Sequence, residues 1–382
     1  MVKVKGESDN RSKGRWCLLV AVNIIALAFI HNTCNSRSLP GSAQEARSTE
    51  TSSSAPVVTI AAISSPTPLS TEAPLMTLPQ PLMLEPCQRL GFSQSNQDCI
   101  IDKIFKAIGT TNKYYVEYGF NTNEQCSGTG PSTCLLWKSG NWKGLLLDGS
   151  HTNEAINLRA HYLYSNNMVA ILEKYNVPKE LDFYSGDMDS HDYFVMKSVL
   201  DSGKFRPRLI STEYNPNYPI DWEISQMDPT ISKPDQEPPP YTFQGCVHGG
   251  SASAFRFLME KHGYELVAVV NHLDLFWIRK DILEKYNYKP SGTFEELMAG
   301  KTKYSQHPIK TDGMFLSNLV DIRVYEETQN YRQANRAIVQ TILDHIKSTT
   351  EPTIACLGAI KVEQVEEYLA NHPPIGEHLN LS

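Results

Sequence analysis

Four short apolar segments, each ending in or beside an acidic residue, constrain the fold of this chain more than any other feature. They are Tyr114–Gly119 with Glu117, Gly144–Gly149 with Asp148, Leu181–Asp189 with Asp187 and Asp189, and Arg208–Pro216 with Glu213. Short apolar runs separated by helix-sized intervals are typical of buried parallel strands, so the sequence predicts an α/β fold. Ligands of open α/β sheets bind beyond the carboxyl ends of the strands. We therefore expect these acids to line one crevice.

The segments between and after these strands predict helices and a closing hairpin. Helices are expected at residues 95–108, 153–160, 168–175, 193–200 and 251–262, with a short helix after Pro131 and a weak strand at 161–164. Residues 264–270 and 273–279 are joined by Asn271-His272 and predict an antiparallel hairpin. Residues 214–242 are rich in Pro, Asp and Asn and predict a long functional loop or lid.

The N-terminal segment predicts a membrane anchor. Residues 1–15 carry several Lys and Arg side chains and precede the apolar run WCLLVAVNIIALAFI, which begins at Trp16. Positive charge before such a run favours a cytosolic N-terminus. We predict a cytosolic tail at 1–15, a signal-anchor at 16–31 and a luminal remainder, hence a single-pass type II protein of the endoplasmic reticulum or Golgi membrane. A cleaved signal peptide is the alternative, and the protein would then be secreted.

Composition divides the remainder of the chain into three parts. Residues 32–88 are rich in Ser, Thr and Pro, a composition that cannot bury a core and predicts a stalk. Residues 89–315 contain the predicted strands and form the expected catalytic domain. Residues 316–382 predict a helical C-terminal extension, with helices near 330–347 and 361–370.

Seven of the eight cysteines follow the apolar run, and a luminal position would let them form disulfides. Cys87 with Cys99 and Cys126 with Cys134 are the candidate pairs within the predicted domain and its approach. An odd luminal number leaves at least one thiol free or paired between chains.

The overall charge restricts the partners. A formal net charge of -7 and a pI near 5.9 argue against a nucleic-acid partner, because phosphate binding needs a basic face. The expected partners are a small-molecule or glycan acceptor and, through the N-terminal anchor, a membrane.

Five motifs occur in order along the predicted domain. They are VEYGFNTNE (116–124), GLLLDGS (144–150), DFYSGDMDSHDYF (182–194), RPRLISTEYNPNYP (206–219) and GYELVAVVNHLDLFWIRKD (263–281). Together they resemble the FkbM-type family of S-adenosylmethionine-dependent methyltransferases, which includes anchored, Star-like relatives. The resemblance implies a Rossmann-like, mostly parallel sheet with a closing antiparallel hairpin. It also implies S-adenosylmethionine as the cofactor and methyl transfer to an oxygen, often on a sugar.

The resemblance assigns cofactor-binding residues. Glu117, Gly119 and Asn121 fall in the first-strand motif that cradles the cofactor, and Asp148 corresponds to the acid that binds the ribose hydroxyls. One carboxylate can accept hydrogen bonds from both hydroxyls, although an acid before a glycine is also common in simple turns. Asp187 belongs to the acidic motif where cofactor and acceptor meet.

The predicted catalytic residues are Asp187, Asp189, His191 and Glu213. Methyl transfer to a hydroxyl needs an oriented acceptor and a base, and either aspartate or His191 can take the proton. Glu213 ends a buried strand, which favours a role with the acceptor or a metal. Two carboxylates with Glu213 and Asn215 could hold a divalent metal ion, which is a further candidate cofactor.

Two other functions compete with a secretory-pathway O-methyltransferase that acts on a glycan or another hydroxylated acceptor. Asp187-Met188-Asp189 also matches the D-x-D pattern with which glycosyltransferases hold a metal and a nucleotide-sugar. A catalytically inactive, Star-like trafficking protein is the third possibility. It is suggested by two departures from the family pattern, Phe120-Asn121-Thr122 in place of the usual second glycine and Gly186 in place of an apolar strand residue.

Overall fold

The computed structural model of the protein describes residues 78–127, 131–238, 248–302, 314–348 and 361–373. The chain divides into Met1–Thr71 and Glu72–Ser382, and all described residues belong to the second part. The predicted cytosolic tail, the signal-anchor and most of the stalk lie outside the described residues. Within the described ranges, no helix has the length and apolar character needed to cross a membrane.

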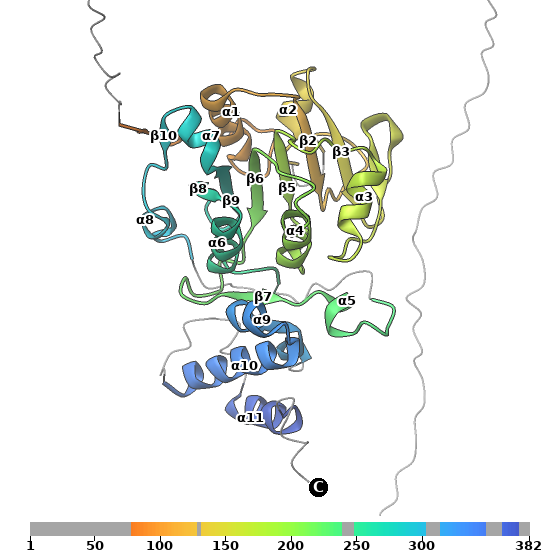
Figure 1. Ribbon diagram of the computed structural model, residues 1–382, viewed down its shortest axis with the longest axis vertical. Helices are drawn as coiled ribbons and strands as arrows, with labels where there is room; N and C mark the ends of the chain where they lie inside the picture. Colours follow the sequence, from red (N-terminus) through yellow and green to blue (C-terminus); the bar gives the residue numbers. More distant parts are fainter. Residues whose placement is uncertain (1–77, 128–130, 239–247, 303–313, 349–360, 374–382) are drawn as a thin grey trace, which may run out of the picture. The chain divides into compact units, whose positions relative to one another are not determined.

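Seven strands form the central sheet, in the order β4-β3-β2-β5-β6-β9-β8 (Figure 1). They are β2 (Tyr114–Tyr118), β3 (Lys143–Asp148), β4 (Leu158–Ala160), β5 (Phe183–Gly186), β6 (Leu209–Glu213), β8 (Tyr264–Val269) and β9 (Asp274–Arg279). The first five strands of this order are parallel, whereas β9 pairs antiparallel with both β6 and β8. This confirms the predicted α/β fold with a Rossmann-like sheet closed by an antiparallel hairpin.

Helices cover both faces of the sheet and bury two apolar cores. The main helices are α1 (Gln97–Ile108), α2 (Cys134–Lys138), α3 (Met168–Lys174), α4 (Asp192–Asp201), α6 (Ala252–Lys261) and α7 (Lys280–Lys285). One core joins Val116 and Tyr184 of the sheet to side chains of α3, α4 and α6. The other joins Tyr115 and Phe183 to side chains of α1 and α7. Since neighbouring strand residues point to opposite faces, burial on both sides explains why these strands are apolar runs.

The predicted helix at 153–160 and strand at 161–164 are wrong. The structure has a single 3-10 turn, η1 (Glu154–Ile156), followed by β4 at the edge of the sheet. Asn153 caps the turn through its side chain, and Asn157 adopts a left-handed conformation with φ of 55°. Asparagine side chains that bond to nearby backbone compete with helix formation, so this segment turns early and enters the sheet sooner than its apolar pattern predicted.

Residues on the N-terminal side of the domain pack against it. Strand β1 (Gln80–Pro81) pairs with β10 (Tyr288–Lys289), and Leu82 and Leu84 belong to the second core. Residues 78–88, which the sequence assigned to the stalk, are therefore attached to the domain.

A small second sheet joins the described part of the predicted long loop, residues 214–238, to the C-terminal segment. The loop contains β7 (Ile224–Gln226) and α5 (Pro229–Ser232), and β7 pairs antiparallel with β11 (Leu319–Asp321). The remaining elements are α8 (Phe294–Met298), η2 (Met314–Asn318), α9 (Ile322–Thr328), α10 (Tyr331–Ser348) and α11 (Val362–Asn371). Helix α10 contacts β11, α9 and α11 (Figure 1). A third apolar core joins α10 and α11 to β7 and β11. The loop is thus a structural support for the C-terminal helices.

Two disulfides join Cys87 to Cys99 and Cys126 to Cys134, the pairs that the sequence offered as candidates. The first holds the N-terminal segment against α1. The second connects the loop after β2 to the first residue of α2, beside the crevice described next.

Candidate functional site

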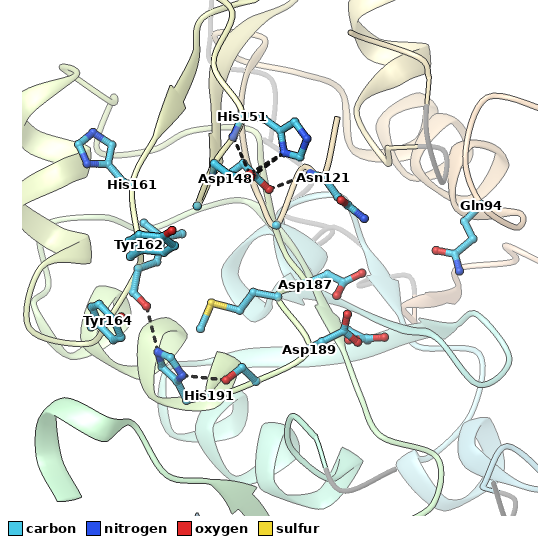
Figure 2. Close-up of a pocket in the computed structure, with 17 residues that line it drawn as sticks. Gln94, Asn121, Asp148, His151, His161, Tyr162, Tyr164, Asp187, Asp189 and His191 are labelled. Carbon is cyan, nitrogen blue, oxygen red and sulfur yellow. Dashed lines mark hydrogen bonds and ion pairs between the residues drawn. The ribbon is translucent and has the colours of Figure 1, made fainter. Parts of the chain in front are cut away.

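A cavity of about 530 Å³ lies where strands β2, β3, β5 and β6 end (Figure 2). Among the residues that line it are Gly119, Asn121, Asp148, Asp187, Asp189, His191 and Glu213. Each of these residues ends one of the four strands or follows it in the next loop. The structure therefore brings the strand-end acids to one crevice, with the exception of Glu117, which is absent from the cavity wall.

The cavity has an aromatic side and an acidic side. Tyr162 and Tyr164, in the segment after β4, lie on one side, and Asp187 and Asp189 point toward Gln94 on the other (Figure 2). The sequence interpretation missed Gln94 and the two tyrosines. A correct prediction of where β4 ends would have placed Tyr162 and Tyr164 after a parallel strand. Residues in that position face the ligand crevice.

Asp148 anchors the turn after β3. Its Oδ1 accepts hydrogen bonds from the amides of Ser150 and His151, both at 2.8 Å, and its Oδ2 accepts one from the amide of Asn121 at 3.0 Å. Burial by itself would raise the pKa of Asp148, but these hydrogen bonds outweigh it and the net shift is downward. Asp148 is therefore an ionised carboxylate that holds two loops together and keeps acceptor capacity on Oδ2.

Glu117 holds the beginning of α2. Its Oε1 accepts a hydrogen bond from the Ser132 amide at 2.8 Å, and its Oε2 accepts bonds from the amide and the hydroxyl of Thr133. Burial raises the pKa of Glu117 to about 6, although these hydrogen bonds lower it. The structure thus places this predicted cofactor residue beneath the cavity, where it positions a neighbouring segment.

Two glycines permit close backbone approaches at the crevice. Gly119 has a φ of 76°, and a Cβ atom there would lie 1.4 Å from the carbonyl oxygen of Asp187. The loops after β2 and β5 therefore meet directly through their backbones. A Cβ atom at Gly186 would lie 2.1 Å from the ring of Tyr118. Packing of this tyrosine explains why glycine replaces an apolar residue in β5.

Asp187 and Glu213 form a partly buried carboxyl pair at the cavity wall, and their side chains hydrogen-bond to each other. Removal from water raises the pKa of both groups well above the usual range. The ionised form of each group is therefore disfavoured at this place.

Asp189 is the carboxylate most open to a ligand at the acidic side. Its side chain is 46% exposed, and its backbone is in the left-handed region with φ of 55°. That conformation costs a non-glycine residue on the order of 1 kcal/mol and is concentrated at functional sites. The strain is maintained by Asp192, whose carboxylate accepts hydrogen bonds from the amides of Met188 (2.9 Å) and Ser190 (3.0 Å).

A group of oxygen and nitrogen atoms at the acidic side has the spacing of metal ligands. Carboxylate oxygens of Asp189 and Glu213 and an imidazole nitrogen of His248 lie within 4.8 Å of one another. Asn215, which the sequence grouped with these acids, is buried, donates a hydrogen bond to the His248 carbonyl at 2.9 Å, and accepts one from the Asn217 amide. Asn215 therefore supports the loop that carries His248.

His191 is enclosed and neutral. Its Nε2 lies 2.9 Å from the carbonyl oxygen of Leu163 and so donates to it, which leaves Nδ1 to accept from Ser190 Oγ at 3.0 Å. The ring stacks on Tyr164 with 5.4 Å between centroids, and burial lowers the pKa of His191. The imidazole therefore connects the loop after β5 to the segment after β4, with both ring nitrogens engaged.

Asp274, at the start of β9 beneath the acidic side, makes the stability of the fold depend on pH. It is buried, and its Oδ2 accepts a hydrogen bond from Gln97 at 2.9 Å. Burial raises the pKa of Asp274 to about 6, whereas an unfolded aspartate titrates near pH 4 (about 3.9). The folded state binds this proton more tightly, so the contribution to stability is complete below about pH 4 and is lost as the pH rises through about 6.

We expect the Asp274→Asn variant not to lose this contribution to stability as the pH rises. The melting temperature of the variant relative to wild type should therefore rise between about pH 4.5 and about pH 7, by the equivalent of about 2 kcal/mol. Thermal unfolding followed by circular dichroism at each pH measures the difference. A difference that does not change with pH would show that Asp274 is ionised in the folded protein throughout.

The sheet order, with one reversed strand, and the crevice at the strand ends define a Rossmann-like methyltransferase fold. No protein-family model matches the sequence, and a search of curated proteins finds no significant match. Membership of the FkbM-type family therefore stays a prediction.

Solved structures similar to this chain include two proteins bound to SAH. The MycE methyltransferase from the mycinamycin biosynthetic pathway, in complex with Mg and SAH, is 15% identical, with 47% of this chain and 49% of that chain covered and a TM-score of 0.29. The N-terminal domain of EvdMO1 with SAH bound is 11% identical, with 48% of this chain and 80% of that chain covered and a TM-score of 0.29. The chain thus spans about half the length of the MycE chain that it matches.

Proposed function

We propose that the protein is an S-adenosylmethionine-dependent O-methyltransferase. The observation that carries the proposal is the charge of the cavity, which is lined by Asp148, Asp187, Asp189 and Glu213, while none of its described lining residues is Lys or Arg. S-adenosylmethionine bears a cationic sulfonium and an ammonium group, which complement such a wall. A ligand that carries phosphate groups would be repelled by it.

The two sides of the cavity fit the two halves of this cofactor. Asp148 Oδ2, at the end of β3, has acceptor capacity for a ribose hydroxyl. Tyr162 is 49% exposed, and its ring offers a flat surface for a base. The carboxylates of Asp187 and Asp189 would face the cationic groups. A volume of about 530 Å³ is also in the range of small-molecule sites.

The residues at the acidic side suit proton removal from an acceptor hydroxyl. When bound, S-adenosylmethionine supplies a methyl group on a cationic sulfur, which becomes the neutral sulfur of S-adenosylhomocysteine once the acceptor oxygen has taken the methyl group. Asp189 is the best-placed base because its carboxylate is half-exposed at the cavity. Desolvation disfavours the ionised form of Asp187 and of Glu213, and both nitrogens of His191 are engaged.

Binding of S-adenosylmethionine to the purified full-length protein tests the proposal. Isothermal titration calorimetry should show that wild type binds the cofactor and that Asp148→Ala binds it at least about tenfold more weakly, because a charge-assisted hydrogen bond contributes roughly 1.5–3 kcal/mol. Asp235→Ala, which changes an exposed acid outside the cavity, is the control and should bind like wild type. Absence of binding by wild type at high micromolar concentration would overturn the proposal.

A divalent cation is the alternative to Asp189 as the group that prepares the acceptor hydroxyl. Asp189, Glu213 and His248 would hold it, and it would polarise an acceptor oxygen. We expect Mn²⁺ or Mg²⁺ to raise the melting temperature of wild type, by the equivalent of about 2.7 kcal/mol at a concentration of 100 times Kd. Asp189→Asn should remove this effect and Asp235→Asn should keep it. Equal shifts in all three proteins would exclude these ligands.

The alternative of a glycosyltransferase is disfavoured by the geometry of the D-x-D residues. Asp187 bonds to Glu213, and only Asp189 is open to a metal. The described cavity wall also offers no Lys or Arg side chain for a diphosphate. Manganese-dependent binding of a nucleotide-sugar, without binding of S-adenosylmethionine, would favour this alternative.

The alternative of an inactive, Star-like protein makes a different prediction. It requires that Asp148→Ala and Asp189→Ala leave the cellular function intact. The close packing around Gly119 and Gly186 weakens the sequence argument for inactivity, because Gly186 is explained by the neighbouring ring of Tyr118.

We further propose a luminal location and a glycan or another hydroxylated acceptor. Two disulfides among the described residues support an oxidising compartment. The basic and apolar N-terminal segment supports a type II anchor.

A further inference from the structure

The loop from Gly119 to Ser127 forms part of the cavity wall through Gly119 and Asn121. At its near end, the amide of Asn121 donates a hydrogen bond to Asp148 Oδ2 at 3.0 Å. In its middle, Asn123 accepts a hydrogen bond from the Thr152 amide at 3.2 Å. The conformation of this loop therefore decides where the acceptor groups of the cavity lie.

The loop achieves its shape without the second glycine that the sequence pattern leads one to expect. Asn121 and Cys126 have φ values of 53° and 66°, in the left-handed region that side chains disfavour. Asparagine tolerates this region better than most residues, but cysteine has no such advantage. A strained loop persists only when surrounding contacts hold it.

The far end of the loop is held covalently. Cys126 is bonded to Cys134, a fully buried residue at the start of α2. The neighbouring Gln125 donates a hydrogen bond to Thr133 Oγ1 at 3.1 Å, and Thr133 is in turn held by Glu117. The disulfide thus ties the strained end of the loop to a segment that is itself fixed to the sheet.

We propose that the Cys126–Cys134 disulfide preorganises the loop for cofactor binding and replaces the missing glycine as the device that shapes this wall. The inference rests on the proposed function, since the ligand is S-adenosylmethionine. Without the disulfide, the loop samples other conformations, and the apparent affinity falls in proportion to the fraction that remains competent to bind.

The other disulfide provides a matched control. Cys87 and Cys99 are 12 residues apart, compared with 8 residues for Cys126 and Cys134. Of the described residues that Cys87 and Cys99 enclose, Gln94 lines the cavity, at the acidic side. Removal of the Cys87–Cys99 disulfide should destabilise the fold without altering the wall at Asn121 and Asp148.

The experiment compares two double variants of the full-length protein, Cys126→Ala/Cys134→Ala and Cys87→Ala/Cys99→Ala. Calorimetry should show that the first binds S-adenosylmethionine about tenfold more weakly than wild type and that the second, which releases only the segment carrying Gln94, loses less affinity than the first. Hydrogen exchange of the amides at 119–127 should be faster in the first variant alone. Equal affinity of the first variant and wild type would overturn the inference.

Two further results keep this test decisive. If wild type does not bind S-adenosylmethionine, the proposed function fails, and the exchange rates at 119–127 still report whether the disulfide orders the loop. If Cys126→Ala/Cys134→Ala does not fold, Cys126→Ala alone replaces it, because it opens the disulfide while the buried side chain of Cys134 stays in place. Affinity reduced about tenfold in Cys126→Ala would support the inference, and an unchanged affinity would overturn it.

Discussion

Gly119→Ala should abolish cofactor binding and destabilise the domain by about 4 kcal/mol or more. The added Cβ atom would lie 1.4 Å from the carbonyl oxygen of Asp187 and 2.5 Å from its carbonyl carbon. Both are backbone atoms, so no rotation of a side chain can relieve the overlap. The loops after β2 and β5 would have to separate, and these loops carry Asn121 on one side and Asp187 and Asp189 on the other.

Gly140→Ala is the matched control for this variant. Gly140 has a φ of 74°, close to the 76° of Gly119, but a Cβ atom there would have no heavy atom within 4 Å. Its replacement therefore reports the penalty of the left-handed backbone alone, about 1 kcal/mol. Thermal unfolding and calorimetry of both variants measure the comparison. Similar losses of stability in the two variants would show that the loop after β5 can move away from Gly119.

Arg208→Ala should destabilise the protein by about 3–5 kcal/mol, because it leaves a buried carboxylate without its counter-charge. Arg208 donates to Asp182 Oδ1 at 2.5 Å and to the carbonyl oxygens of Ile108 and Gly109. Asp182 is fully buried and also accepts a hydrogen bond from the Lys113 amide at 2.7 Å. This network lies where β5 begins, whereas the cavity lies where the strands end.

The variant should therefore lose stability while the folded protein keeps its cofactor affinity. Arg206→Ala is the control, because Arg206 is 49% exposed and its pairs with Glu180 (4.0 Å) and Asp281 (3.6 Å) are long. We expect its loss to stay below about 1 kcal/mol. Urea unfolding gives the stabilities, and calorimetry below the unfolding transition gives the affinities. A weakened affinity in Arg208→Ala would mean that a change where the strands begin alters the cavity where they end.

The pattern of apolar segments in the sequence predicted most of the fold. The segments ending at Glu117, Asp148, Asp187 and Glu213 are strands β2, β3, β5 and β6, and the closing hairpin is present as predicted. These strands are buried on both faces, so their sequences are continuous apolar runs that stand out from the intervening helices. The edge strand β4 was misplaced because it is short and is preceded by a turn built from asparagine side chains.

The sequence predicted most of the acidic residues that line the cavity, but not the groups to which their side chains bond. Asp148, Asp187, Asp189 and Glu213 line the cavity, since the carboxyl ends of parallel strands meet at one edge of the sheet. Glu117 occupies an equivalent position in sequence, yet its carboxylate is taken by the backbone of Ser132 and Thr133.

The sequence by itself determined that this chain forms a mostly parallel sheet with acids at the strand ends, because hydrophobic periodicity and strand spacing are local properties of the chain. It also offered two candidate disulfides, since closely spaced cysteines need little more than a turn between them, and left the pairing itself open. Only the tertiary structure decided that Asp187 pairs with Glu213, that His248 approaches Asp189, and that the Cys126–Cys134 disulfide holds one end of a loop of the cavity wall. These contacts depend on which loops meet at the ends of the strands. Packing between residues far apart in sequence decides which loops meet.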